Sequence, residues 1–181
     1  MKVTGTAILN ATVERVWETM LDPAVLARAI PGCAALERTG PDRYRGTISA
    51  GVGSIKGVFE GDVELTDLRR PASLVMRASG VGGPGTVKAD VSVELAGTGD
   101  GRTELRYDAD AVVGGMVGGV GQRMLTGVAR KMAGEFFARL DGELTGAAPH
   151  AAASGEPAAP ASPPTAPASP PGPRPGGPPS A

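Results

Sequence analysis

The stretch DADAVVGGMVGGVGQRMLTGVARKMAGEFFARL, residues 108–140, indicates how this chain folds. Its later part repeats apolar residues at intervals of three and four, which is typical of a helix with one buried face. The start of this predicted helix is unusual, because residues 114–121 include five glycines. An interior helical glycine costs about 1 kcal/mol relative to alanine. The segment therefore gives up helix stability for close backbone contact, for mobility or for room beside the helix.

The apolar arc of this helix needs a surface to cover. Glu135 and Arg139 interrupt the arc; four residues apart, they are expected to pair with each other. The alternative is that they form a polar anchor for the head group of a ligand. The arc itself consists of Val117, Val120, Gly121, Met124, Leu125, Val128, Met132 and Phe136.

The surface that this arc covers is predicted by the residues that precede it. From residue 36 to residue 113 apolar and polar residues alternate, and glycine- or proline-containing turns separate the alternating runs. The pattern indicates an antiparallel meander with one solvated face and one apolar face. Tyr44, Thr103 and Tyr107 are the polar members of the apolar set. The solvated set includes the carboxylates Glu60, Asp62, Glu64, Asp90, Glu94, Glu104, Asp108 and Asp110.

The N-terminal residues predict one strand and two short helices. A loose alternation over residues 2–10 favours a strand. Helical spacing follows over residues 13–21, and Pro23 ends that helix and opens a second one over residues 24–30. The order is therefore strand, two short helices, about six strands and one long helix. This order predicts an α+β fold, in which a curved antiparallel sheet wraps around the C-terminal helix.

Composition restricts the classes of function. A formal net charge of −1 and 3% aromatic residues argue against nucleic-acid binding. The single cysteine and the absence of a long apolar run lead us to expect a soluble cytoplasmic protein. Residues 145–181 hold twelve of the seventeen prolines, so we expect a domain over residues 1–144 and a disordered tail over residues 145–181.

The predicted interior carries little reactive chemistry. The only histidine, His150, belongs to the tail, so the sequence predicts neither catalytic residues nor a metal site inside the fold. Cys33 has no histidine partner in the sequence around it, and we interpret it as a small buried hydrophobic residue rather than a nucleophile.

Glycines cluster at three places that we expect to meet at one end of the sheet. Two explanations fit equally well: the glycines form a mobile gate, or they allow tight turns and close packing. The predicted gate residues are Gly82, Gly83, Gly114, Gly115, Gly118 and Gly119.

Four segments resemble the G-subunit family of carbon monoxide dehydrogenase. They are DPxxLxxxIPGC at residues 22–33, GVFEG at residues 57–61, GTV at residues 85–87 and the run at residues 107–137. The resemblance covers about residues 1–144. It implies a helix-grip fold of the START and Bet v 1-like type, with seven strands gripping the C-terminal helix around an apolar cavity. The family is associated with attaching molybdenum-containing carbon monoxide dehydrogenases to the cytoplasmic membrane, where electrons enter the respiratory chain.

The leading hypothesis is a non-catalytic carrier that binds a lipophile, with a respiratory quinone as the first candidate. The carrier would present this ligand to a molybdenum carbon monoxide dehydrogenase or a related hydroxylase, and would associate peripherally with the inner face of the cytoplasmic membrane. Two alternatives are a docking adaptor without a ligand and a cyclase-like enzyme. The residues predicted to line the cavity are Tyr44, Ile48, Phe59, Val63, Met76, Val91, Tyr107, Met116, Val117, Val120, Met124, Val128 and Met132.

Overall fold

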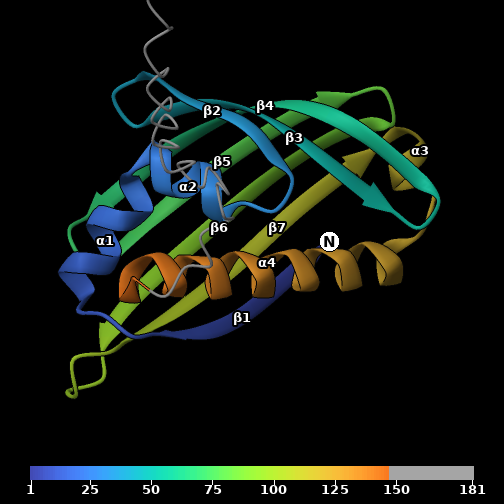
Figure 1. The fold of residues 1–181 in the computed structure, drawn as a ribbon. Helices are drawn as coiled ribbons and strands as arrows, with labels where there is room; N and C mark the ends of the chain where they lie inside the picture. The colour runs from blue at the N-terminus through green and yellow to red at the C-terminus, as the bar shows by residue number, and fades with distance from the viewer. Residues whose placement is uncertain (147–181) are drawn as a thin grey trace, which may run out of the picture. The chain divides into compact units, whose positions relative to one another are not determined.

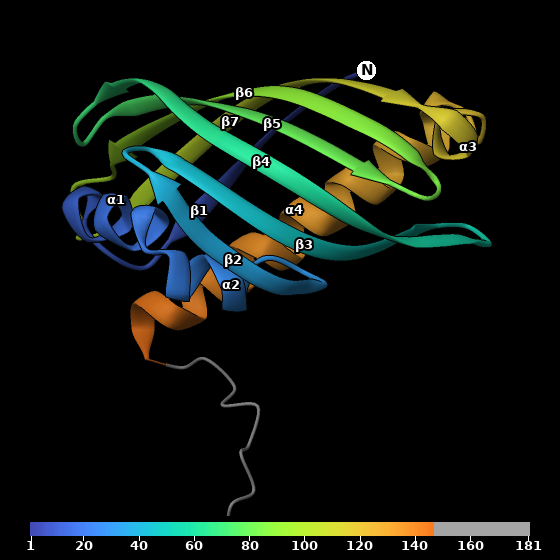
Figure 2. The same cartoon turned by 90° about the horizontal axis from the view of Figure 1, so that it is seen from above.

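One antiparallel sheet and one long helix dominate the computed structural model, which describes residues 1–146. Of the predicted tail, residues 147–181 lie outside the described residues. Figures 1 and 2 show the sheet curving around α4 (Gln122–Thr145), which confirms the predicted helix-grip architecture. The strand order is β1-β7-β6-β5-β4-β3-β2. The strands are β1 (Lys2–Leu9), β2 (Cys33–Gly40), β3 (Arg43–Val52), β4 (Ile55–Arg69), β5 (Ser73–Gly82), β6 (Gly85–Gly97) and β7 (Thr103–Gly114).

The strand register confirms the predicted inner and outer faces. Tyr44 pairs with Val63, Val63 with Ala78, and Ala78 with Ala89, so these apolar residues form one row across the sheet. Directly paired residues of antiparallel strands point to the same face, so the row faces α4 throughout. The carboxylates fall in the alternate rows and face outward, where many of them pair with arginines.

Two short helices connect the two edges of the sheet. The Thr12 side chain caps α1 (Val13–Leu21) by accepting a hydrogen bond from the Arg15 amide at 3.4 Å. Asp22 ends α1 and caps α2 (Pro23–Ala29), because its carboxylate accepts from the Ala24 amide at 2.8 Å. Pro23 occupies the first turn of α2, where its missing N–H costs no hydrogen bond.

The apolar arc predicts that the glycine-rich segment is the start of one long helix, and this prediction is wrong. Strand β7 continues to Gly114, a single turn α3 (Gly115–Gly118) follows, and α4 begins only at Gln122. Gly115 and Gly121 adopt φ values of +77° and +94°, which disrupt a right-handed helix and favour glycine. The break separates the side chains before residue 119 from the arc of α4.

Two apolar cores lie at opposite ends of the layer between the sheet and α4. The larger core lies beside α1 and α2 and consists of Leu9, Val16, Trp17, Ala29, Tyr44, Leu65, Leu74, Val93, Leu95, Leu105 and Leu140. The smaller core lies beside α3, and its buried residues are Val52, Val117 and Leu125. Helix α4 therefore contributes to both cores, with Leu125 near its first turn and Leu140 near its last.

Polar contacts fix the C-terminal half of α4. Arg28 of α2 donates two hydrogen bonds to the Glu143 carboxylate, at 2.9 and 2.7 Å. Asn10 donates from its backbone and side-chain nitrogens to the Asp141 carboxylate, at 2.7 and 2.9 Å. Two-point contacts define orientation as well as distance, so they set the direction in which α4 leaves the larger core.

Truncating Leu105 to alanine should lower the free energy of unfolding by about 2–5 kcal/mol, because its side chain is fully buried in the larger core. Val112 lies on the outer face of the same strand and is 70% exposed, so Val112→Ala should change the free energy of unfolding by less than about 0.5 kcal/mol. Urea unfolding of the full chain measures both values. Equal losses would contradict the assignment of the two faces.

Candidate functional site

Between the two cores lies a band of apolar residues that belongs to neither. We call these residues the inner band. Ile48, Ala78, Val87, Ala89, Ala109 and Ala111 supply its sheet side, and Ala129, Met132 and Ala133 supply its helix side. All nine are half-buried although they lie on the side where the sheet and α4 face each other. Solvent therefore still reaches apolar surface in the middle of the sheet–helix layer.

Small side chains explain why this band is not filled. Gly46, Gly61 and Gly80 are consecutive partners in one inner row of the sheet, next to the row that contains Ala78 and Ala89. Six of the nine band residues are alanines. The two cores contain larger side chains at both ends of the layer, whereas alanine and glycine predominate in the middle. Apolar surface left in this way can bind an apolar ligand without losing hydrogen bonds.

Gly80 and its partner Gly61 differ in the room around them. A Cβ atom placed on Gly80 would have no neighbour closer than the Glu60 carbonyl oxygen at 3.8 Å. The same atom on its partner Gly61 would lie 2.9 Å from the Ser79 carbonyl oxygen, which is too close. Close backbone packing therefore requires glycine at residue 61, whereas a Cβ atom at residue 80 would make ordinary van der Waals contacts.

The predicted lining residues divide into three groups. Tyr44 and Val117 are buried within the cores. Met116 and Met124 are 63% and 49% exposed, and their predicted place in an interior wall is wrong, because the break at residues 119–121 leaves them at the molecular surface. The remaining nine are half-buried, namely Ile48, Phe59, Val63, Met76, Val91, Tyr107, Val120, Val128 and Met132.

The two tyrosines differ in what their hydroxyl groups do. Tyr44 donates to the Leu21 carbonyl oxygen at 2.9 Å and accepts from Arg38 at 3.1 Å, so its hydroxyl stabilises the end of α1. Tyr107 packs its ring against Phe137, with 5.5 Å between ring centroids. Among residues 1–146 no hydrogen bond involves the Tyr107 hydroxyl, which lies over Gly5 of β1, where an added Cβ atom would be 2.6 Å from it.

Trp17 provides a second unused donor. Its side chain is 3% exposed, and its Nε1 is the buried side-chain polar atom that lacks a partner within the described part of the chain. An unsatisfied buried donor costs about 1–3 kcal/mol, which a ligand acceptor would offset. The indole also lies in the larger core, so its fluorescence can report on changes in the layer between the sheet and α4.

Close packing accounts for most of the predicted gate glycines. A Cβ atom on Gly82 would collide with the Val58 carbonyl oxygen, and one on Gly118 would lie 2.6 Å from the Val113 carbonyl oxygen. Gly115 has a positive φ, and Gly114 and Gly119 also have close neighbours. Gly83 alone of the six has nothing within 4 Å of an added Cβ. The second explanation, close packing and tight turns, therefore suffices at five of the six positions.

The charged residues of α4 do not form the predicted pair. Glu135 lies 3.9 Å from Lys131, one turn earlier, and Arg139 is exposed. Burial raises the pKa of the Cys33 thiol, whose Sγ donates to the Ala35 carbonyl oxygen at 3.4 Å. A raised pKa keeps the thiol protonated and disfavours a nucleophilic role. Within residues 1–146 no three His, Cys, Asp or Glu side chains cluster as metal ligands.

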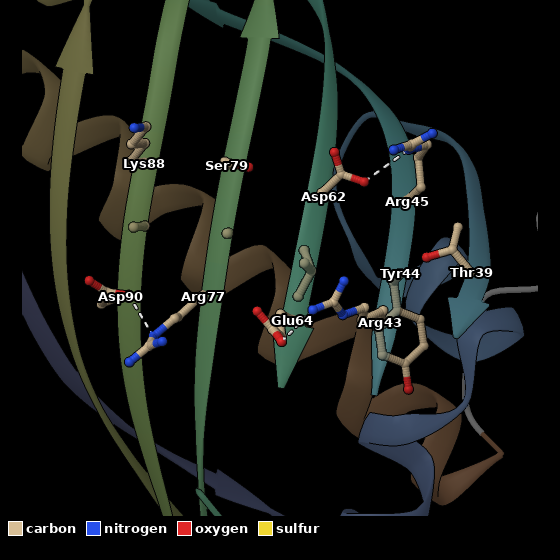
Figure 3. A pocket seen from close by; sticks show the side chains of 13 residues that line it. Thr39, Arg43, Tyr44, Arg45, Asp62, Glu64, Arg77, Ser79, Lys88 and Asp90 are labelled. Atoms are coloured by element: carbon tan, nitrogen blue, oxygen red, sulfur yellow. Dashed lines mark hydrogen bonds and ion pairs between the residues drawn. The ribbon is translucent and has the colours of Figure 1, made fainter. Parts of the chain in front are cut away.

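A charged hollow of about 500 Å³ lies on the outer face of the sheet. Figure 3 shows it with α4 behind the strands, and Arg43–Glu64, Arg45–Asp62 and Arg77–Asp90 pairs across it. These pairs are exposed, and such pairs contribute about 0–1 kcal/mol each. A second hollow of about 310 Å³ lies beside the β3–β4 hairpin. The residues that line these two hollows do not include the helix side of the inner band.

Comparison with known proteins identifies the family. The family model for the G subunit of carbon monoxide dehydrogenase (CoxG) matches residues 5–145. The chain belongs to the CoxG family. This family is one of accessory subunits, and the match includes β2 to β7, all four helices and most of β1. No curated protein matches this sequence.

Solved structures confirm the fold of this CoxG family member. A conserved protein from Geobacillus kaustophilus is 36% identical, with a TM-score of 0.78, covering 81% of this chain and 97% of that one. A START superfamily protein from Mycobacterium smegmatis is 16% identical, with a TM-score of 0.65 and coverages of 81% and 98%. The Zhui aromatase/cyclase from Streptomyces sp. R1128 is 17% identical, with a TM-score of 0.62 and coverages of 80% and 93%. The last two likenesses show the fold alone.

The inner band has a signal in the sequence, namely small residues at predicted core positions. Ala78, Ala89, Ala109 and Ala111 all fall in the apolar phase of the sequence, whereas the predicted wall consists of large side chains. Ala129 and Ala133 lie on the matching part of α4. Side-chain size therefore marks the band, but only the register shows that the small residues of several strands lie side by side.

The different surroundings of Gly80 and Gly61 lead to a stability prediction. Gly80→Leu should leave the free energy of unfolding unchanged or raise it by up to about 1 kcal/mol, because a Cβ atom fits at residue 80 and the unfolded chain loses freedom. Gly61→Leu should lower it by about 1–3 kcal/mol, because the Ser79 carbonyl oxygen blocks the Cβ. Urea unfolding of both variants measures the difference. A similar loss in both would show that the inner band is already filled.

Proposed function

We propose that this protein is a non-catalytic carrier that binds a membrane-derived lipophile, a respiratory quinone, against the inner band. It presents that quinone to a molybdenum-containing carbon monoxide dehydrogenase or a related hydroxylase, which passes its electrons to the quinone. The observation that carries the proposal is the half-buried apolar band, which neither core covers. Membership of an accessory-subunit family of carbon monoxide dehydrogenase supports the choice of this enzyme as the partner.

The energetics of the inner band suit a flexible isoprenoid chain. Burying one five-carbon isoprene unit stabilises a complex by up to ~4 kcal/mol, at ~0.8 kcal/mol per carbon group. Two or three units then reach micromolar affinity after the costs of association. Met132 is the one long, unbranched side chain of the band, and thioethers adapt to irregular ligand shapes.

Two unused donors suit the polar end of a quinone. The Tyr107 hydroxyl and the Trp17 Nε1 both lack partners among the described residues, and both residues belong to or pack against the larger core. A quinone carbonyl oxygen accepts one hydrogen bond from either group without bringing a charge into the apolar layer. The isoprenoid chain would then extend along the alanine-rich rows toward the smaller core.

The inner face of the sheet carries neither a carboxylate nor an imidazole that could transfer a proton to a ligand, among residues 1–146. Within the described residues, no carboxylate or histidine on this face points toward α4. General acid–base chemistry needs such a group within hydrogen-bond reach of the substrate. We therefore assign binding and delivery to this protein and leave quinone reduction to the dehydrogenase.

The carrier function is tested by extracting protein purified from its native host with organic solvent. Mass spectrometry should detect quinone, and adding a short-chain quinone to extracted protein should quench Trp17 fluorescence in a saturable manner. Gly80→Leu should weaken this quenching at least about tenfold, since its side chain occupies the binding space.

Ser79→Leu is the matched control, because it places the same side chain on the opposite face of β5. It should bind quinone as the unaltered protein does. If no lipid is extracted and Trp17 does not respond, the protein is not a carrier, and a docking adaptor without a ligand becomes the better account. Equal quenching in both variants would place the ligand outside the inner band.

A further inference from the structure

Large apolar side chains are exposed mainly at one end of the sheet. We call this end the tip and define it as residues 49–59, 80–88 and 112–124. Five of the six large hydrophobic residues that the described chain exposes lie there, and Ile8, near the opposite end, is the sixth. Their exposed fractions lie between 49% and 70%. The five are Val58, Val81, Val112, Met116 and Met124.

Specific contacts hold the parts of the tip together. The Val117 amide of α3 donates to the Pro84 carbonyl oxygen of the β5–β6 turn at 3.1 Å. The Sδ of Met124, in the first turn of α4, lies beside Gly53 of the β3–β4 turn. Figures 1 and 2 both show α3 and these two hairpins at the end of the molecule opposite α1 and α2. The exposed residues are therefore presented by a fixed scaffold.

The tip carries charge of only one sign. Its three sequence ranges contain Lys56, Lys88 and Arg123, all exposed, and no aspartate or glutamate. The whole chain, in contrast, has 18 basic and 19 acidic residues. Carboxylates begin at the border of the tip, where Glu60 pairs with Val81 in the strand register. The tip thus combines exposed apolar side chains with cations alone.

We infer that the tip docks on the surface of an anionic lipid bilayer. The three cations match negatively charged lipid headgroups, and the methionine and valine side chains enter the boundary between headgroups and acyl chains. A bilayer demands no fixed pattern of hydrogen bonds, and the tip offers flexible, interchangeable apolar groups with no aromatic anchor among its exposed residues. These features favour a lipid surface over a folded protein partner.

Docking at the tip rests on the proposed function, because a carrier of a membrane lipophile has to meet the bilayer near its binding space. The tip includes Val52 and Val117 of the smaller core and also Val87 of the inner band, so the tip and the inner band adjoin. Docking would bring that small core, rather than the larger one, to the lipid surface. Vesicle binding and quinone binding are nevertheless separate measurements, so each can fail without the other.

The test is flotation of the full-length, solvent-extracted protein with vesicles. Vesicles of equal parts phosphatidylcholine and phosphatidylglycerol should bind it, vesicles of phosphatidylcholine alone should bind it much less, and added salt should weaken binding. Each basic residue near an anionic surface contributes about fivefold in affinity, so the Lys56→Gln, Lys88→Gln, Arg123→Gln triple variant should lose at least about tenfold.

Two matched controls keep the test specific to the tip. Arg15→Gln, Arg69→Gln, Arg106→Gln removes the same charge from exposed positions away from the tip and should keep most of the binding. Met116→Asp should weaken vesicle binding, whereas Ile8→Asp, which places the same charge near the opposite end, should not.

Equal losses in the two triple variants would overturn the inference, because they would show a response to net charge alone. Self-association through the tip, detected as a dimer that Met116→Asp dissociates and that does not float with vesicles, would overturn it as well. If the protein floats with vesicles but does not bind quinone, the docking inference stands and the proposed carrier function is wrong.

Discussion

The arrangement depends on how α4 is held across the sheet, by one apolar core toward each of its ends. Leu140 packs in the larger core and Leu125 in the smaller one, while paired hydrogen bonds from Arg28 and Asn10 fix the helix direction. A rigid helix supported at two points spans the distance between them. The residues under the middle of the helix can then have small side chains, and most of them are alanine or glycine. The stability of the fold and the space for a ligand therefore come from different residues.

The two ends of the sheet–helix layer therefore differ in composition. The larger core, with α1, α2 and the end of α4, supplies most of the buried apolar area and the stability that goes with it. The smaller core is built from three buried residues and lies under an end that is apolar, basic and rich in closely packed glycines. A protein that takes a lipophile from a membrane needs one end that stays folded and one that can face lipid. No helix of the described residues is long and apolar enough to span a bilayer.

Much of the fold could be predicted from residue patterns, because alternation and helical spacing report directly on which side chains are buried. Asp22 and Pro23 fixed the boundary between α1 and α2 to within a residue. The site was harder to predict, because a ligand site consists of what the side chains leave empty. Met116 and Met124 looked like wall residues on a continuous helix, and only the positive φ of Gly121 shows that the helix restarts there. The alanine rows become a site only when the register aligns them across the strands.

Binding of a lipophile in the middle of the sheet–helix layer can be observed with methyl-labelled alanine and methionine and nuclear Overhauser effects from a bound short-chain quinone. We expect contacts from the quinone to the methyl groups of Ala89, Ala111 and Met132, which come from two strands and from α4. Contacts confined to Met116 and Met124 at the surface, with none to the alanine methyls, would contradict it.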